Sequence, residues 1–407
     1  MKTWRGVCRS APLCILLLAA CESGGGGTTG FATRDSAGIQ IVENTAPQWK
    51  EGEGWTLNAE PSVDIGLVDG PLEYQLSRVG AALRLASGQI AVSNGGSQEI
   101  RFYDAAGTYL RAVGGNGGGP GEFQGLTWIR ALPGDSLLAY DDRARRLSTY
   151  DSTSALVGSN TLTFNDQTGH PRVVERFPDG TLLVQTGQVY GAGKETSGAK
   201  RDSAHYFRTS SDGSRINTVM GLRGAEAFIR ADAKSMTVTT LVFGRSSAYS
   251  LAGDHVFAAE TDTYEIRQYT PEGTLVRLIR RRHEPRPVTD ADVRELKQRR
   301  MDGIDNPAFR TQIEGMMAEM PIPSTMPAFS TLRADDAGNL WVQEYPGVDP
   351  DAPTQWTVFD PEGRMLGGLS MPGRFRAMQI GSDFVLGVWK DDLDVEHVRL
   401  YRLEKPS

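Results

Sequence analysis

Cysteine and histidine are scarce in this chain of 407 residues. The three cysteines are Cys8, Cys14 and Cys21, and none follows Cys21. The rest of the chain therefore contains no internal disulfide, cysteine–zinc site or cysteine nucleophile. The five histidines stand apart, without the H-x-H or H-E-x-x-H spacing of zinc sites. A G-x-S-x-G elbow and a phosphate-binding loop are also absent, so the sequence offers no catalytic motif.

Long apolar runs and an excess of positive charge are missing as well. After residue 20, no stretch approaches the about 20 apolar residues that a membrane-spanning helix needs. Residues 1–20 hold three of the 43 basic residues and none of the 50 acidic ones. The remainder has 40 basic against 50 acidic residues, a net charge of −10. An acidic chain without a basic block is a poor binder of nucleic acid, and we expect no such partner.

The first 20 residues have the pattern of an export signal. Lys2, Arg5 and Arg9 precede the apolar residues 11–20, a run too short to span a bilayer. The run ends in Leu-Ala-Ala-Cys, which resembles the lipobox of bacterial lipoproteins. The resemblance implies that residues 1–20 are removed as a signal peptide and that Cys21 becomes the lipidated N-terminus. The alternative is an ordinary secretory signal in which Cys21 has no role.

A glycine-rich segment follows the cysteine. Residues 21–34 include four consecutive glycines and are expected to form a flexible tether. Two or more acyl chains on Cys21 would anchor this tether firmly in a membrane. An Asp after the lipidated Cys is the usual signal for inner-membrane retention in enteric bacteria, so Glu22 favours the outer membrane. We expect a lipid-anchored protein of the bacterial cell envelope that faces the periplasm or the surface.

Glycine is abundant, with 47 residues, and it recurs in two kinds of turn. A tight inner turn between apolar strands appears six times, at Gly88, Gly134, Gly180, Gly253, Gly338 and Gly381. An outer Asp-x-x-Gly turn, or a looser form of it, appears near Gly107, Ser154, Gly213, Gly273 and Gly363, with a displaced copy at Gly38. A period of about 45 to 50 residues predicts an all-β propeller of four-stranded blades, here six, over residues 35–405.

The displaced turn indicates how the ring of blades closes. The sixth repeat reaches the C-terminus before its outer strand is complete, so an N-terminal strand is expected to supply it. Two segments compete for this position, residues 39–42 and residues 62–65, and both are candidates to join the last blade.

The repeats, together with Gly-Pro-Gly-Glu-Phe at residues 119–123, resemble six-bladed β-propellers of the NHL-repeat and TolB-like superfamily. More narrowly, the chain is similar to bacterial lipoproteins of this kind over roughly residues 35–405. The resemblance implies an architecture and leaves the chemistry open. TolB-like propellers use one face to contact envelope proteins. Propeller lactonases hold Ca²⁺ in the central channel, but matching Asp, Asn and Glu ligands cannot be aligned in this chain.

Residues 287–321 interrupt the repeat and predict a short α-helical insertion. Thr289 and Asp292 form a capping-box pattern, and Asn306-Pro307 has the pattern of a second helix start. Apolar residues then recur at helical spacing up to Pro321, and three of them are methionines: Phe309, Ile313, Met316, Met317 and Met320. We favour a helix that docks on a blade, and a lid or partner-binding helix is the alternative.

Arginines recur at one position of the repeat. Arg84, Arg130 and Arg176 are 46 residues apart, each just before an inner turn, and Arg333 is placed similarly. Equivalent positions in a ring of blades form a ring in space, so these residues are candidates for an anion or ligand site at the channel mouth. The interpretation that we favour is that each arginine packs between blades and pairs with a neighbouring acid.

Together these patterns predict a monomeric, tethered, non-catalytic propeller that binds an envelope protein or a small ligand and needs no cofactor. The alternative is a propeller enzyme of the lactonase or lyase kind with Ca²⁺ in its channel. The residues alone do not decide whether any catalysis occurs.

Overall fold

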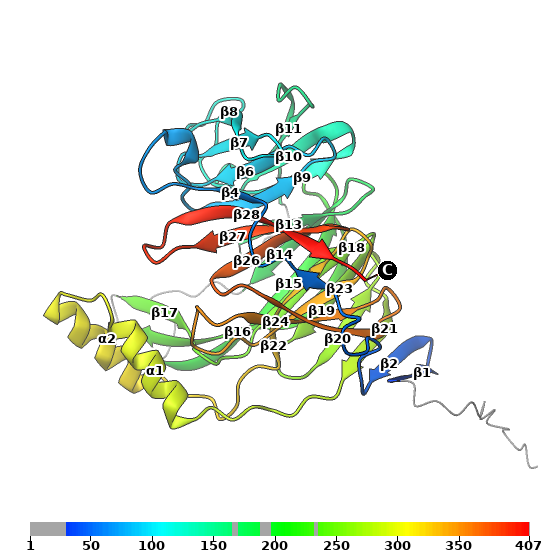
Figure 1. Ribbon diagram of the computed structural model, residues 1–407, viewed down its shortest axis with the longest axis vertical. Coiled ribbons are helices and arrows are strands. Elements are labelled where there is room, and N and C mark those ends of the chain that lie inside the picture. Colours follow the sequence, from blue (N-terminus) through cyan, green and yellow to red (C-terminus); the bar gives the residue numbers. More distant parts are fainter. Residues whose placement is uncertain (1–29, 165–169, 188–196, 232–234, 407) are drawn as a thin grey trace, which may run out of the picture.

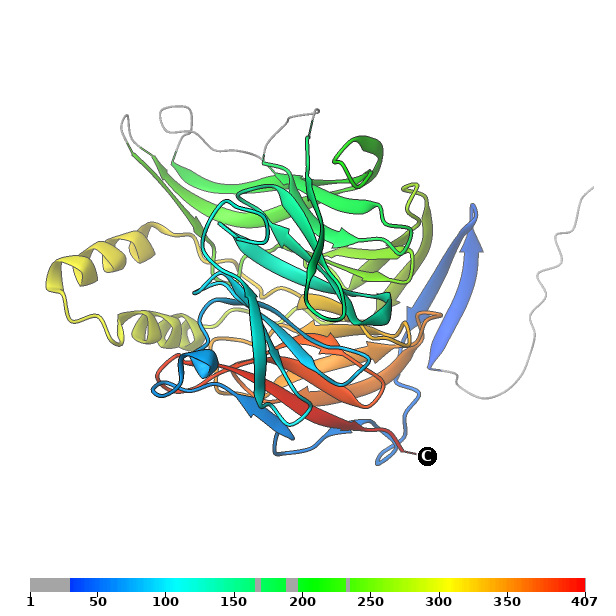
Figure 2. The same ribbon diagram turned by 90° about the horizontal axis from the view of Figure 1, so that it is seen from above.

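The computed structural model of the protein describes residues 30–164, 170–187, 197–231 and 235–406. Its β-sheets are arranged as the blades of a β-propeller (Figure 1 and Figure 2). Cys21 and the predicted signal peptide lie outside the described residues. Within them, neither helix has the length and apolar character needed to cross a membrane.

The described strands form six sheets, numbered here by their order in the chain. The first sheet contains β5 (Val79–Arg84), β6 (Ile90–Asn94), β7 (Glu99–Tyr103) and β8 (Tyr109–Gly114). The second contains β9 (Leu126–Leu132), β10 (Ser136–Asp141), β11 (Arg146–Tyr150) and β12 (Leu156–Thr161). The third contains β13 (Arg172–Arg176), β14 (Leu182–Gly187), β15 (Gly198–Thr209), β16 (Arg215–Ala231) and β17 (Met236–Thr240).

The remaining three sheets include all the N-terminal strands. The fourth contains β18 (Ser247–Ala252), β19 (His255–Glu260), β20 (Glu265–Tyr269) and β21 (Leu275–Arg281), extended by β2 (Ile39–Asn44) and β1 (Phe31–Ser36). The fifth contains β22 (Phe329–Ala334), β23 (Leu340–Glu344), β24 (Thr354–Phe359) and β25 (Met365–Met371). The sixth contains β26 (Phe375–Ile380), β27 (Phe384–Lys390) and β28 (Glu396–Glu404), joined by β4 (Val63–Ile65) and β3 (Thr56–Leu57).

The two competing N-terminal segments go to different sheets. β4 pairs antiparallel with β28, as expected for residues 62–65. β2 pairs parallel with β21 of the fourth sheet, so the expectation that residues 39–42 join the last blade is wrong. The side chain of Asn44 explains this position: Nδ2 donates to the carbonyls of Arg280 (3.1 Å) and Gly363 (3.0 Å), and Oδ1 accepts from Met365 N (2.7 Å). Strand β1 begins at Phe31, inside the range assigned to the tether.

The outer Asp-x-x-Gly turns need their glycines for two reasons. At Gly107 the backbone has φ 87°, a conformation that side chains with a Cβ rarely adopt. A Cβ at Gly107 would also lie 2.9 Å from Cγ1 of Val63 in β4. Similar close approaches occur at Gly273 to β16 and at Gly363 to β21, and Gly213 approaches Thr163, which follows β12. The motif therefore sets the spacing between neighbouring sheets.

The hydrophobic core lies between the sheets. Inner strands of neighbouring sheets are in contact, as β5 is with β9, β18 with β22 and β26 with β5. Fully buried residues such as Ile129, Val342 and Leu386 fill the spaces between them. Alternating inward side chains of stacked sheets produce this kind of core.

The third sheet extends beyond the others, because β15 and β16 are 12 and 17 residues long. The sequence did not predict this extension. The two predicted helices, α1 (Asp290–Met301) and α2 (Pro307–Glu319), begin at the expected caps Thr289 and Asn306. Met320, next to α2, packs with Phe228 and Leu241 of the extension. Figure 2 shows the helices on the opposite side of the molecule from β1 and β2.

Candidate ligand-binding site on the inner strands

The inner strand of a sheet is its first strand, and four of the predicted arginines lie on such strands. Arg84 ends β5 and connects the first sheet to the sixth. Its guanidinium lies 3.5 Å from Asp383 Oδ1 and 4.8 Å from the ring centroid of Phe384. Its backbone N–H donates to Gln379 Oε1 at 2.7 Å. Arg84 therefore pairs with an acid of the neighbouring sheet, which is the structural role that we favoured.

Arg130 connects the second sheet to the third. Its Nε and NH2 donate to the two carboxylate oxygens of Glu175 at 2.9 and 2.5 Å, and its guanidinium stacks on Trp128. Burial opposes the charge of Arg130, but Glu175 outweighs this effect and raises the pKa of the guanidinium. The pair is a bidentate, charge-assisted contact between inner strands β9 and β13.

Arg333 on β22 is in a different situation. Its Nε is shielded from solvent and has no hydrogen-bond partner among the described residues. Burial lowers the pKa of Arg333, Glu175 opposes this, and the positive charges of Arg130 and Arg376 lower it further. A guanidinium that is shielded, surrounded by like charge and without its own carboxylate is costly to keep in a folded protein.

Charged side chains and one tyrosine from five inner strands interact electrostatically with Arg333 or with Tyr249 beside it. We call them the arginine cluster: Arg130 (β9), Arg172 and Glu175 (β13), Tyr249 (β18), Arg333 (β22) and Arg376 (β26). Burial and Glu175 raise the pKa of Tyr249, so its phenol stays protonated and can donate. Arg172 and Arg376 are exposed, so the cluster is open to solvent.

The balance of charge in the cluster is strongly positive. Four arginines face two carboxylates. Arg130 already occupies both oxygens of Glu175. Glu396, which accepts from Val79 N at 2.7 Å, opposes the lowering of the Arg376 pKa by burial. Arg376 donates to the carbonyl of Val79 and lacks an ion-pair partner within the described part of the chain. The donors of Arg333, Arg376 and Tyr249 thus remain for an anionic group. Equivalent positions in the repeat did not reveal Glu175 and Tyr249, because they stand one residue before the aligned positions Arg176 and Ser250.

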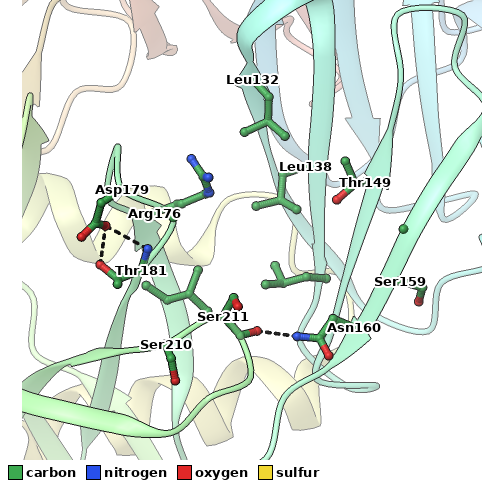
Figure 3. Close-up of a pocket in the computed structure, with 14 residues that line it drawn as sticks. Leu132, Leu138, Thr149, Ser159, Asn160, Arg176, Asp179, Thr181, Ser210 and Ser211 are labelled. Atoms are coloured by element: carbon green, nitrogen blue, oxygen red, sulfur yellow. Dashed lines mark hydrogen bonds between the residues drawn. The ribbon is translucent and has the colours of Figure 1, made fainter.

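Arg176 does not belong to this cluster. It ends β13 and points over a cleft between the second and third sheets, together with Asp179 and Thr181 (Figure 3). The predicted ring of Arg84, Arg130, Arg176 and Arg333 is therefore spread over different surroundings, and only Arg130 and Arg333 lie in the arginine cluster. The side chains of successive inner strands follow different bulges, as between Val173 and Glu175, which breaks the equivalence.

The cluster does not suit a metal ion. Ca²⁺ takes six to eight oxygen ligands, whereas guanidinium groups only donate hydrogen bonds. Elsewhere in the described ranges, no group of three or more His, Asp or Glu residues is arranged to hold a metal.

No family model matches this chain. No curated protein matches it either. Similar solved structures include a putative exported protein from Bacteroides fragilis, at 14% identity and a TM-score of 0.48, with 87% of this chain and 96% of that chain covered. A streptogramin B lyase has 10% identity and a TM-score of 0.41, and the match covers 86% of this chain and 98% of the lyase chain. A gluconolactonase from Xanthomonas campestris has 12% identity and a TM-score of 0.39, and the match covers 82% of this chain and 87% of the gluconolactonase chain. Similarity this distant gives no information on ligand or reaction.

Proposed function

We propose that this protein is a membrane-tethered, non-catalytic β-propeller that binds an anionic ligand at the arginine cluster. The ligand is a small molecule with carboxylate or phosphate groups, or an acidic segment of an envelope protein. The observation that carries the proposal is Arg333, a shielded guanidinium next to Arg130 and Arg376 without a carboxylate of its own. An anion bound there would form charge-assisted hydrogen bonds and relieve the repulsion among the arginines.

The propeller is proposed to be a closed ring of six blades. The pairing of β4 with β28 supports closure by the N-terminal strand. The close approach of Gly107 to Val63 also supports it, because the same approach recurs between other pairs of sheets.

Anchoring in the outer membrane through lipidated Cys21 rests on the sequence alone. Its test is mass spectrometry of the N-terminal peptide from native membranes. A diacylated Cys21 is expected, and Cys21→Ser is expected to release the protein from the membrane fraction. An unmodified N-terminus with the same membrane association would contradict the anchor.

The alternative, a channel-metal enzyme of the lactonase or lyase kind, finds less support. Such a site needs several oxygen ligands on the inner strands. At the arginine cluster, Glu175 is paired with Arg130, and Glu396 is the other carboxylate beside it, next to Arg376.

Isothermal titration with inorganic phosphate and with citrate at low salt tests the binding site. The wild-type protein is expected to bind at least one of them. Arg333→Gln combined with Arg376→Gln is expected to weaken binding at least tenfold, because both substitutions remove charge and leave Arg130–Glu175 intact. Arg294→Gln is the matched control, since Arg294 is an exposed residue of α1. No binding by the wild type, or equal binding by the double variant, would refute the proposal.

A further inference from the structure

A second cleft lies outside the arginine cluster, between the second and third sheets (Figure 3). Its volume is about 670 Å³, within the range of small-molecule sites. Strands β9 to β12 form one wall, and the turn between β13 and β14 forms the other with the turn between β15 and β16. It is therefore built from two sheets that the core already holds together.

The floor of this cleft is apolar. Leu138, Leu147 and Leu182 line it and are 6%, 6% and 0% exposed, and Leu132 lies beside them. These side chains are fixed by the core, so an apolar ligand meets a preformed surface. Gly158 in β12 also lines the cleft and leaves room above the leucines.

Among the described residues at the rim, one arginine carries an unpaired charge. Asp179 is fully occupied: it accepts from Thr181 N (2.9 Å) and Thr181 Oγ1 (2.7 Å), and it forms an ion pair with Arg208. Arg176, by contrast, has no ion-pair partner or side-chain hydrogen bond in the part of the chain that the structure describes, and its guanidinium extends into the cleft (Figure 3). Within the described residues, the cleft thus combines an apolar floor with a single free cation at its edge.

The geometry points to a second binding site, for an amphipathic organic anion, in the cleft between the second and third sheets. The apolar body of the ligand lies on Leu138, Leu147 and Leu182. Its carboxylate, sulfonate or phosphate group accepts hydrogen bonds from Arg176. This site is separate from the arginine cluster, so the outcome of its test does not depend on the function proposed above.

Two dyes with the same ring system test this site. 1-Anilinonaphthalene-8-sulfonate carries an anionic group, and N-phenyl-1-naphthylamine is the same body without the sulfonate. Fluorescence titration of the purified protein gives a Kd for each. The anionic dye is expected to bind about tenfold more tightly than the neutral dye, because only the sulfonate reaches Arg176.

Two variants locate the binding. Arg176→Gln is expected to raise the Kd of the anionic dye about tenfold and to change the Kd of the neutral dye by no more than about twofold. Gly158→Val is expected to raise the Kd of both dyes more than tenfold, because the larger side chain fills part of the cleft. Valine suits this strand position: the glycine does not have a positive φ, and the nearest atom to an added Cβ is 3.7 Å away. The exposed Arg294→Gln of helix α1 should change neither Kd.

Each outcome decides the inference. Unchanged binding of both dyes to Arg176→Gln and Gly158→Val overturns the site. If Arg176→Gln raises the Kd of both dyes equally, the claim that Arg176 binds the anionic group is wrong. Thermal melting of each variant shows whether it is folded, and Gly158→Ala replaces Gly158→Val if the larger side chain lowers the melting temperature. Arg333→Gln should leave both dyes unaffected, which separates this cleft from the arginine cluster.

Discussion

At the scale of single residues, Glu175 compensates the positive charge of the arginine cluster. Its side chain is 17% exposed and that of Arg130 is 29% exposed, so both charges are largely withdrawn from water. A half-buried pair of this kind contributes little by comparison with apolar residues, but removing one partner leaves the other charge uncompensated.

Glu175→Gln is therefore expected to lower the free energy of unfolding by about 2 kcal/mol, measured by urea denaturation. Glu43→Gln is the control. It breaks two ion pairs, with Arg34 and with Arg280, in which the side chains are about one third to one half exposed. We expect a loss below about 1 kcal/mol. Glu175→Gln should also bind phosphate or citrate more tightly, because the arginines lose their competing carboxylate. Weaker anion binding by this variant would contradict the assignment of the site.

Asp262 gives a prediction of pH dependence. Arg201 donates to both of its carboxylate oxygens at 2.7 Å. Burial alone would raise the pKa of Asp262, but the hydrogen bonds and charge of Arg201 lower it below the ordinary value of 3.8. The ion pair therefore stabilises the fold above about pH 3.8, and this contribution is lost as the pH falls through the lower folded-state pKa.

Asp262→Asn should be less stable than the wild type at pH 7, and the difference should shrink as the pH falls below about 4. Urea midpoints measured from pH 7 to pH 3 test this. A difference that stays constant over the whole range would show that the ion pair does not set the pKa of Asp262.

At the scale of the elements, one outer-turn glycine and one inner-turn glycine separate two costs of substitution, the steric contact with the neighbouring sheet and the backbone conformation. Gly363 has φ 85°, and a Cβ there would lie 2.7 Å from Cγ1 of Ile279 in the preceding sheet. Gly253 has φ 59° with no atom within 4 Å of the Cβ position. Gly253→Ala is expected to cost about 1 kcal/mol for the backbone alone, and Gly363→Ala at least about 3 kcal/mol. Equal costs in urea denaturation would show that the turn does not set the distance between sheets.

The helical insertion contacts the third sheet through Met320, which packs with Phe228 and Leu241. Neither helix contains a buried residue, and Met320, which is 9% exposed, is the buried side chain of the contact. An ion pair between Glu319 and Arg230 (3.4 Å) also joins α2 to the third sheet. Met320→Ala is expected to speed amide exchange in α2 while shifting the global melting temperature by little, because a local unit opens first. Phe309→Ala, at an exposed position on the same helix, should change neither measurement. A large global destabilisation by Met320→Ala would instead place the helices in the main folding unit.

At the scale of the whole molecule, the N-terminal strand β4 links the start of the chain to the sixth sheet by pairing with β28. Ile65 is fully buried between the first and sixth sheets. Ile65→Ala is expected to cost about 2 to 5 kcal/mol and to speed exchange in both β5 and β26. Ile41→Ala is the control, because Ile41 is similarly buried in β2. Its effect should stay within β1, β2 and β21. Identical exchange patterns for the two variants would contradict a closing role for β4.

The sequence predicted what depends on local chemistry. The inner and outer turns follow from glycine and Asp hydrogen bonds within four residues, as at Asp104, and the helices follow from the caps at Thr289 and Asn306. The pairing of β2 was missed because it depends on Asn44 and Gly363, more than 300 residues apart. The arginine cluster was predicted in part, because bulges such as that between Val173 and Glu175 shift which inner-strand side chain reaches it.

The position of β2 also determines how a mechanical load would enter the molecule. A membrane anchor at Cys21 would pull on Phe31, the first residue of β1. Among the described strands, β1 pairs with β2 alone, and the guanidinium of Arg364 lies over the Phe31 ring. That force meets the five-residue register between β2 and β21 and the buried Asn44 before it reaches β4. Movement of the anchor would peel away an accessory hairpin, while β4 remained unloaded and the sixth sheet kept its outer strand.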